Sequence, residues 1–288
     1  MVRFFPAIVA LLAALPLPAA YSGRDLFVPI AGRGIGHDGR AFSTSLWLTN
    51  LSGRDPVDVR IAFLQSGHAN PSPRTTAMRL GPSETRAFED LGAGIFGAES
   101  AIGALRIEAS SDVVAHTHIN IRGPADPIAA TVPTAFNAIP ARFAAGKGQS
   151  SIIQGFSTGT SPLLHYKLYL VETTGQPVYL DLDVVDEKGR EAADHKLFLA
   201  GFEARTIEAR EEFPSLNISS GLIRISGVNG SGRVIMAGSQ VSTVTQYGTA
   251  DEMSLVATPR SPLPLTELIA YSVIGAVIVI VLLKRRSG

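Results

Sequence analysis

Short runs of alternating apolar and polar residues fill most of the chain between residues 24 and 258. In the run 44–50, Leu46 and Leu48 fall on one face and Trp47 falls on the other, because successive side chains of a strand point to opposite sides. The run 57–63 alternates in the same way, and clusters of Gly, Pro, Asn and Ser separate the runs. Short strands with turn signals at intervals of about ten residues predict an all-β sandwich or barrel.

Three details of this pattern give specific expectations. The run 26–30 predicts an edge strand, because Pro29 has no amide hydrogen to donate to a neighbouring strand. The runs 103–108 and 113–121 predict two separate strands. Residues 90–98 predict one short helix, although their glycines weaken it.

The second part of the chain repeats the pattern of the first at a nearly constant distance. A steady offset over several elements indicates a duplicated unit. We therefore expect two tandem β-sandwich domains, at residues 24–144 and 148–258. Three pairs of residues give the offset: Leu168 lies 122 positions after Leu46, Leu199 lies 119 after Leu80, and Arg224 lies 118 after Arg106.

Four segments of the first copy carry a resemblance to a known family. They are Leu-Phe-Val-Pro-Ile-Ala at 26–31, Ser-Thr-Ser-Leu-Trp-Leu-Thr-Asn-Leu-Ser at 43–52, the run at 57–64, and Leu-Gly-Pro-Ser at 80–83. With these segments the chain resembles an uncharacterised Ig-like β-sandwich repeat of secreted bacterial surface proteins. The second copy lacks the Trp and the Val-Pro opening, so its assignment depends on the internal repeat. The resemblance implies two tandem Ig-like β-sandwich domains at a cell surface, and nothing catalytic.

Both ends of the chain are apolar. Residues 1–20 have an early Arg3, an apolar run and then small residues, which is the plan of an N-terminal signal peptide. Residues 268–283 form a second apolar run, which predicts one C-terminal transmembrane helix. The basic tail 284–288 is expected in the cytoplasm, and the Pro-containing segment 259–267 is a stiff spacer. The alternatives are an uncleaved anchor or a buried helix at the first run and a buried core helix at the second.

Composition narrows the possible functions. The chain has 25 Lys and Arg residues and 25 Asp and Glu residues, so its formal net charge is zero. A nucleic-acid partner is therefore not expected, since such proteins usually carry a basic face. The chain has no cysteine, which excludes disulfides, thiol catalysis and Cys-ligated zinc. We expect no cofactor.

Trp47, His116 and His118 are the candidate ligand-binding residues. His116 and His118 lie two apart on an expected strand, so their rings share a face. Two imidazoles on one face could bind a metal, with Glu108 on a neighbouring strand as a third ligand, but a solvated polar face is the simpler interpretation and we expect no metal site. Trp47 is either an exposed platform for stacking a sugar or a buried core residue of the sandwich.

Three other patterns match known motifs without their usual context. Gly-x-Gly-x-x-Gly at 34–39 leads into a strand, so a hairpin loop is a better interpretation than a dinucleotide site. Gly-x-Ser-x-Gly at 155–159 centres on Ser157 and is followed by Asp186 and His195 in the order of an α/β-hydrolase, but no βαβ pattern surrounds it. An acidic face at 181–187 could bind Ca²⁺ weakly, although the spacing of a calcium loop is absent. We expect no catalytic residues.

Together these observations predict a non-enzymatic extracytoplasmic protein anchored in the membrane by a single C-terminal helix. Its role is structural, adhesive or scaffolding. The alternative is an ectodomain that binds polysaccharide or a partner protein, and a surface serine hydrolase that uses Ser157 is a third possibility.

Overall fold

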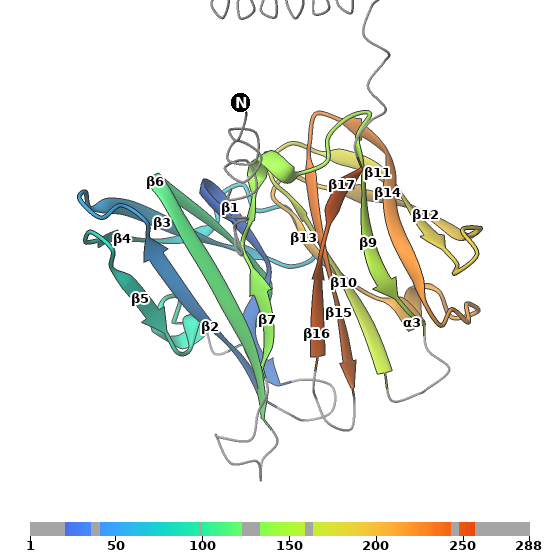
Figure 1. Ribbon diagram of the computed structural model, residues 1–288, viewed down its shortest axis with the longest axis horizontal. Helices are drawn as coiled ribbons and strands as arrows, with labels where there is room; N and C mark the ends of the chain where they lie inside the picture. The colour runs from blue at the N-terminus through green and yellow to red at the C-terminus, as the bar shows by residue number, and fades with distance from the viewer. Residues whose placement is uncertain are drawn as a thin grey trace, which may run out of the picture. The chain divides into compact units, whose positions relative to one another are not determined.

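The computed structural model describes residues 21–35, 41–97, 100–122, 133–158, 164–242 and 248–256, and these form an all-β structure (Figure 1). The expected signal peptide at 1–20, spacer at 259–267, transmembrane helix at 268–283 and tail at 284–288 lie outside the described residues. In the described part of the chain, no helix has the length and apolar character needed to cross a membrane.

The first half of the described chain forms a single sheet that curls over its own core. Its strands are hydrogen-bonded in the order β4-β3-β6-β1-β2-β5, with β7 on β6, β8 on β1, and a further pairing of β6 with β2. Buried residues from β2, β3 and β6, such as Leu46, Ile61 and Leu105, meet in one apolar cluster. The elements are β1 (Ser22–Ile35), β2 (Ala41–Asn50), β3 (Val57–Gln65), β4 (Arg74–Leu80), β5 (Thr85–Phe88), α2 (Leu91–Gly94), β6 (Ala101–Arg122), β7 (Thr134–Asn137), β8 (Ile139–Pro140) and η2 (Ala141–Phe143).

The second half forms two sheets (Figure 1). One has the order β13-β10-β15-β16 and the other has the order β12-β11-β14-β9-β17. Leu168 of β10 and Leu182 of β11 belong to the same buried cluster, so the two sheets enclose a sandwich core. The elements are β9 (Ser150–Phe156), β10 (Leu164–Glu172), β11 (Val178–Val185), β12 (Glu191–Leu199), β13 (Ala204–Glu208), α3 (Ala209–Glu212), β14 (Gly221–Gly230), β15 (Val234–Ser242), β16 (Gly248–Glu252) and β17 (Ser254–Val256).

Both halves use the same strand pairing. β2 pairs with β5 and β6, as β10 pairs with β13 and β15. β3 pairs with β4 and β6, as β11 pairs with β12 and β14. Val178, Leu180 and Leu182 are buried while Tyr179 is exposed. The alternation seen in the sequence therefore sets these registers, because a shift by one residue would turn the apolar side chains out of the core.

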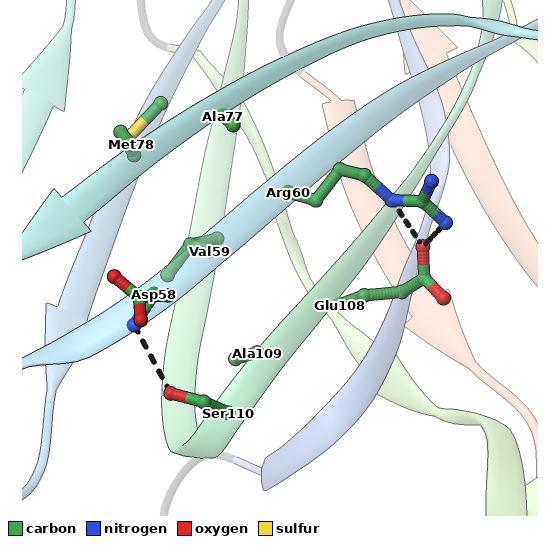
Figure 2. A pocket seen from close by; sticks show the side chains of 8 residues that line it. All are labelled: Asp58, Val59, Arg60, Ala77, Met78, Glu108, Ala109 and Ser110. Atoms are coloured by element: carbon green, nitrogen blue, oxygen red, sulfur yellow. Dashed lines mark hydrogen bonds and ion pairs between the residues drawn. The ribbon is translucent and has the colours of Figure 1, made fainter.

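The two halves differ at β6. This strand is continuous over 22 residues but reverses direction near Ser110, as Figure 2 shows, whereas residues 231–233 separate β14 from β15. The two strands expected at 103–108 and 113–121 are therefore present as the two arms of β6. Ala101 on the first arm pairs with Arg33, and Arg122 on the second arm pairs with Ala41, so both arms end beside the same end of β1.

A polar turn follows β4 and is repeated after β12. In each copy a glutamate accepts a hydrogen bond from the backbone N–H three residues before it and pairs with the arginine two residues after it. The residue before the glutamate has a left-handed backbone, with φ of 54° in one copy and 53° in the other. The first copy has Gly81 N donating to Glu84 Oε2 at 2.6 Å, with Ser83 and Arg86, and the second has Ala200 N donating to Glu203 Oε2 at 2.8 Å, with Phe202 and Arg205.

The two halves share an apolar core. The described residues up to Leu255 form one compact unit. Phe27 and Leu64 of the first half are fully buried, and they belong to the cluster that contains the core of the second half. Ile30 and Phe136 group in the same way with Tyr169, whose ring meets that of Phe136 edge-on at 5.6 Å. This apolar contact buries one face of β1 against the second half.

Polar contacts complete the junction between the halves. Asn70 Nδ2 donates to the carbonyl oxygen of Phe202 at 2.9 Å, and the backbone N–H of Gly67 donates to the carbonyl of Ala204 at 2.8 Å. The Arg106 guanidinium lies 5.0 Å from the Phe202 ring and makes a two-pronged contact with Asp25 at 2.9 and 3.0 Å. The repeated turn after β12 thus serves as a docking point for the first half.

β1 is not the edge strand that Pro29 suggested. It lies between β6 and β2 in the sheet. Its register with β6 shifts between Val28 and Ala31, so Pro29 sits at an irregularity where the missing N–H breaks no ladder hydrogen bond. The short helix expected at 90–98 is present as the single turn α2, where Asp90 Oδ1 accepts a hydrogen bond from the N–H of Ala93 at 3.1 Å.

Candidate functional site

The three candidate residues from the sequence lie on one surface of the first half. β6 runs between β2 and β7, and the registers place Trp47 opposite His116 and His116 opposite Asn137. Ser45 stands opposite His118 one pair further along. The intervening residues of β2 point into the core, so these side chains project from the outer side of the sheet.

The aromatic rings of this surface contact one another. The Trp47 and His118 ring centroids are 4.7 Å apart, and the planes are tilted by 58°. His116 and His118 meet edge-on, also at 4.7 Å. All three side chains are partly exposed. Of the two interpretations of Trp47, the structure has the surface position and not the buried one.

A chain of hydrogen bonds leads from the imidazole pair to β16. His116 Nε2 lies 2.8 Å from His118 Nε2, and His116 Nδ1 lies 3.0 Å from Asn137 Oδ1. The backbone N–H of Asn137 donates to Glu252 Oε1 at 3.1 Å. A carbonyl oxygen only accepts, so His116 carries its proton on Nδ1, and its Nε2 lone pair accepts from His118. We call this set of residues the Trp-His face: Trp47, His116, His118, Asn137 and Glu252.

Burial shifts the pKa of two groups on the Trp-His face. Desolvation lowers the pKa of His118, and the neighbouring His116 lowers it further, so His118 is neutral at pH 7. Desolvation raises the pKa of Glu252, and hydrogen bonds from Asn137 partly offset that rise. His118 therefore presents a neutral donor and acceptor to a ligand at neutral pH.

Hydroxyl and amide groups extend the Trp-His face along the same strands. Asn120 Nδ2 donates to Ser45 Oγ at 2.9 Å, and that hydroxyl donates to the carbonyl of Glu89 at 2.7 Å. The Thr49 and Thr85 hydroxyls lie 2.9 Å apart on β2 and β5. The aromatic centre thus has a border of polar groups that strands hold in place.

Two members of the Trp-His face were not found by sequence analysis. Asn137 lies in an expected strand, and its distance of 21 residues from His116 carries no recognisable signal. Glu252 is 115 residues from Asn137 and reaches it only through contact between the halves. Only the register between β6 and β7 would have identified Asn137, and the sequence does not reveal that register.

Glu108 is not a third ligand for the histidine pair. It lies on the arm of β6 that pairs with β1 and β3, whereas His116 lies on the other arm, which pairs with β2 and β7. Its carboxylate instead binds Arg60, whose Nε lies 2.8 Å from Glu108 Oε2, and Arg106 at 3.3 Å. Among the described residues, no group of three or more His, Cys, Asp and Glu side chains is placed to hold a metal ion together.

The residues of the Gly-x-Ser-x-Gly motif have separate partners. Ser157 Oγ donates to the carbonyl of Ile218 at 3.1 Å. His195 Nδ1 lies 2.6 Å from Glu212, and Asp186 accepts hydrogen bonds from Lys188 and Arg190 in its own turn. Residues 159–163 lie outside the described ranges, and the next described element is the strand β10, where a nucleophile elbow would need a helix.

The other two motifs are also explained by strand structure. The described residues on either side of the glycine loop at 34–39 pair as an antiparallel hairpin, with Arg33 opposite Ser43. In the acidic face at 181–187, Asp183 is buried and accepts hydrogen bonds from Arg224 at 2.8 Å and Ser226 at 2.9 Å. A paired, buried carboxylate of this kind is a structural group and not an open calcium ligand.

A shallow groove lies elsewhere on the first half, on β3, β4 and β6. Its volume is about 570 Å³, and Figure 2 shows polar contacts among its lining residues. Arg60 binds Glu108, and Ser110 accepts a hydrogen bond from the backbone N–H of Asp58 at 3.0 Å. The groove therefore offers a ligand few unused polar groups. Its lining residues are Asp58, Val59, Arg60, Ala77, Met78, Glu108, Ala109 and Ser110.

A second aromatic pair lies on the outer side of β11 and β12. Tyr179 is 59 % exposed and Phe198 is 42 % exposed, and their ring centroids are 4.9 Å apart. Neither ring has an imidazole opposite it, since Asn229 is the other neighbour of Tyr179. This pair gives a natural comparison for the Trp-His face.

Comparison with known proteins leaves the function to be argued from the chain itself. No protein-family model matches the chain, and no curated protein matches it. Among solved structures, it is similar to a lectin from Pleurotus ostreatus in complex with GalNAc, at 12 % sequence identity and a TM-score of 0.20, over 83 % of this chain and 86 % of the lectin. A TM-score of that size carries no argument about this chain's ligand.

Proposed function

We propose that the protein is a non-enzymatic, membrane-anchored extracytoplasmic adhesion protein whose Trp-His face binds a neutral carbohydrate. The observation that carries the proposal is the surface position of Trp47, whose indole lies beside two imidazoles on the neighbouring strand.

The chemistry of the Trp-His face suits a sugar. The apolar face of a pyranose packs on an aromatic ring, while its hydroxyls need donors and acceptors around that ring. The indole of Trp47 provides the aromatic ring. His118, Asn137 and the bordering hydroxyls provide the hydrogen-bond donors and acceptors. These groups stand on paired strands, so little conformational entropy is lost when a ligand fixes them.

Charge supports a neutral ligand over an acidic one. The formal net charge of the chain is zero. His118 is neutral at pH 7, and Glu252 contacts the Trp-His face through Asn137. A polyanionic glycan would need a cluster of Lys or Arg, whereas this face contains none.

The finer description of the fold as tandem Ig-like sandwiches is part of the proposal. In an Ig domain, strand B lies beside E and strand C beside F. The pairs β10–β13 and β11–β14 support the same central arrangement. The outer strands differ, since β9 pairs with β14 and β15 with β10, so the first and seventh strands of the half have exchanged places relative to an Ig domain.

A rigid scaffold without a ligand is the second candidate. The observation that favours it is the apolar core shared by the two halves, which holds them as one body without a flexible hinge. Crosslinking on intact cells with mass spectrometry distinguishes the two candidates. A scaffold is expected to be crosslinked to neighbouring proteins at many surfaces. A glycan-binding protein is expected to lose its crosslinked partners when free sugar is added before the crosslinker.

Replacing Trp47 with alanine is expected to weaken carbohydrate binding by at least about tenfold, which corresponds to about 1.4 kcal/mol. The reason is the loss of the stacking surface, while the polar groups around it remain. Binding is measured on an array of neutral and anionic glycans and then by calorimetry with the best neutral glycan.

The matched control for that experiment is Tyr179→Ala, which removes an exposed aromatic ring from the other half. This variant is expected to bind as the unaltered chain does. Equal binding by the Trp47→Ala variant and the unaltered chain, with both folded by circular dichroism, would exclude the Trp-His face as the sugar site.

The membrane anchor gives a separate prediction. The apolar run at 268–283 ends at a basic cluster and has the composition of a spanning helix. The full chain is expected to stay in the membrane pellet after washing with alkaline carbonate, and a chain that ends at residue 258 is expected in the supernatant. Release of the full chain by carbonate would refute the anchor without affecting the sugar site.

A further inference from the structure

We infer that His116 and His118 form a binding site for a divalent transition-metal ion, with Cu²⁺ preferred, in which the two Nε2 atoms are the protein ligands. Water or an external group fills the remaining positions. This inference does not depend on carbohydrate binding, because it concerns the imidazole nitrogens alone.

The tautomer of His116 is the first argument. Asn137 Oδ1 accepts the hydrogen bond from His116 Nδ1 at 3.0 Å, so the Nε2 lone pair is directed away from Asn137. Metal-binding histidines are usually held in this way, with the second ring nitrogen donating to a carbonyl or carboxylate. Asn137 is itself held by Glu252, which receives the backbone N–H of Asn137 at 3.1 Å. The outer groups of a metal site are thus already in place.

The distance between the two nitrogens is the second argument. His116 Nε2 and His118 Nε2 are 2.8 Å apart. Two nitrogens bound at about 2.0 Å with an angle of 90° between them are also about 2.8 Å apart, whereas a tetrahedral angle requires about 3.3 Å. The spacing therefore matches the adjacent positions of a tetragonal ion such as Cu²⁺ or Ni²⁺ better than those of tetrahedral Zn²⁺.

One proton must move when the metal binds. His118 Nε2 donates to His116 Nε2 in the structure, and this nitrogen must present a lone pair to the ion. Neutral imidazole exists in two tautomers, so His118 shifts its proton to Nδ1, and both rings turn slightly toward the ion. No proton is lost to the solvent in this step, because the proton moves between the two nitrogens of the His118 ring.

The composition of the chain also favours copper. There is no cysteine to compete for a soft metal ion. Among divalent ions, Cu²⁺ binds nitrogen ligands most tightly. A structural Zn²⁺ site needs four protein ligands, and the described residues offer no group of three or more candidate side chains. Two imidazoles suffice for a partly hydrated Cu²⁺.

Trp47 provides the readout. It is the only tryptophan of the chain, and its ring lies 4.7 Å from that of His118. A paramagnetic ion bound between the imidazoles quenches indole fluorescence at this range. Copper(II) chloride is added to the full chain at pH 7 in a buffer that does not bind metals, without sugar. We expect quenching that saturates at one equivalent.

Matched variants test the ligands. His116→Gln and His118→Gln are each expected to weaken Cu²⁺ binding by at least tenfold, and Asn137→Ala by about tenfold because His116 loses its fixed tautomer. His68→Gln removes an exposed histidine elsewhere and is expected to bind as the unaltered chain does. Thermal unfolding of each variant verifies that it is folded, which is expected since both replaced rings are partly exposed.

Electron paramagnetic resonance gives an independent measurement. The Cu²⁺ signal of the unaltered chain is expected to show nitrogen couplings from imidazole, and the double variant H116Q/H118Q is expected to lose them. The site is refuted if the double variant binds Cu²⁺ as tightly as the unaltered chain, or if bound copper leaves Trp47 fluorescence unchanged. Loss of glycan binding in the Trp47→Ala variant has no bearing on either result.

Discussion

Replacing Glu172 with alanine is expected to lower the free energy of unfolding by about 4 kcal/mol or more, enough to leave much of the protein unfolded at physiological temperature. The side chain is fully buried at the end of β10. Its carboxylate is the centre of the junction between the sheets of the second half and the turn after β12.

Five donors converge on this carboxylate. Alanine would leave four backbone N–H groups in a buried site without an acceptor, and each such group costs about 1–3 kcal/mol. The neighbouring Arg106 also faces Glu172 across the contact between the halves, so its positive charge would lose a partner. The donors are Thr174 N at 2.8 Å, Thr174 Oγ1 at 2.6 Å, Gly175 N at 2.7 Å, Phe202 N at 2.9 Å and Arg233 N at 3.1 Å.

A graded set of variants tests this explanation by urea unfolding. Glu172→Gln keeps one acceptor oxygen and sets an NH₂ group against two donors, so it is expected to lose about half as much stability. Asn50→Ala, at the corresponding position of the first half, removes three hydrogen bonds and is expected to cost about 2 kcal/mol. Glu187→Ala, on an exposed turn, is the control and is expected to change stability by less than about 0.5 kcal/mol. Equal stability of the Glu172→Ala variant and this control would contradict the buried-acceptor explanation.

The correspondence of Asn50 and Glu172 shows how much the sequence revealed. These residues are 122 positions apart, the same distance as Leu46 and Leu168. The offset predicted which strands correspond, because period-two alternation is set by burial on one face. It could not predict that an amide in one copy and a carboxylate in the other perform the same task, since each is simply the last residue of its strand.

The position of β1 shows where the pattern was misread. Leu26, Phe27 and Val28 form a continuous apolar run and all three are fully buried. Such a run predicts a strand covered on both faces, and that signal outweighs the edge position suggested by Pro29. The register between β1 and β6 shifts between Val28 and Ala31, and no local pattern in the sequence reveals this shift.

The Trp-His face was predictable in part for the same reasons. Alternation placed His116 and His118 on one face of a strand, and the structure brings Trp47 to that face through the β2–β6 register. The contributions of Asn137 and Glu252 depend on how β7 and β16 meet. Contacts between segments so far apart in the chain arise from tertiary packing, and the local pattern of residues does not encode them.

Replacing Phe27 with alanine is expected to destabilise both halves together, by about 3–5 kcal/mol. The ring is fully buried, it belongs to the cluster that contains the core of the second half, and the Arg106 guanidinium lies 5.8 Å from its centre. Its removal opens a cavity between the halves, where neither half can collapse to fill it. The midpoint of thermal unfolding should fall by about 10 °C.

The two halves have separate optical signals, so their unfolding can be followed independently. Trp47 fluorescence reports on the first half, and the near-ultraviolet signal of the buried Tyr166 and Tyr169 reports on the second. Because the halves share a core, the two midpoints should coincide in the unaltered chain and fall together in the Phe27→Ala variant. Leu46→Ala, which opens a cavity only within the first half, is the matched control. Should the second half keep its original midpoint while the first unfolds early in the Phe27→Ala variant, the halves would be independent domains and the shared core would contribute little to stability.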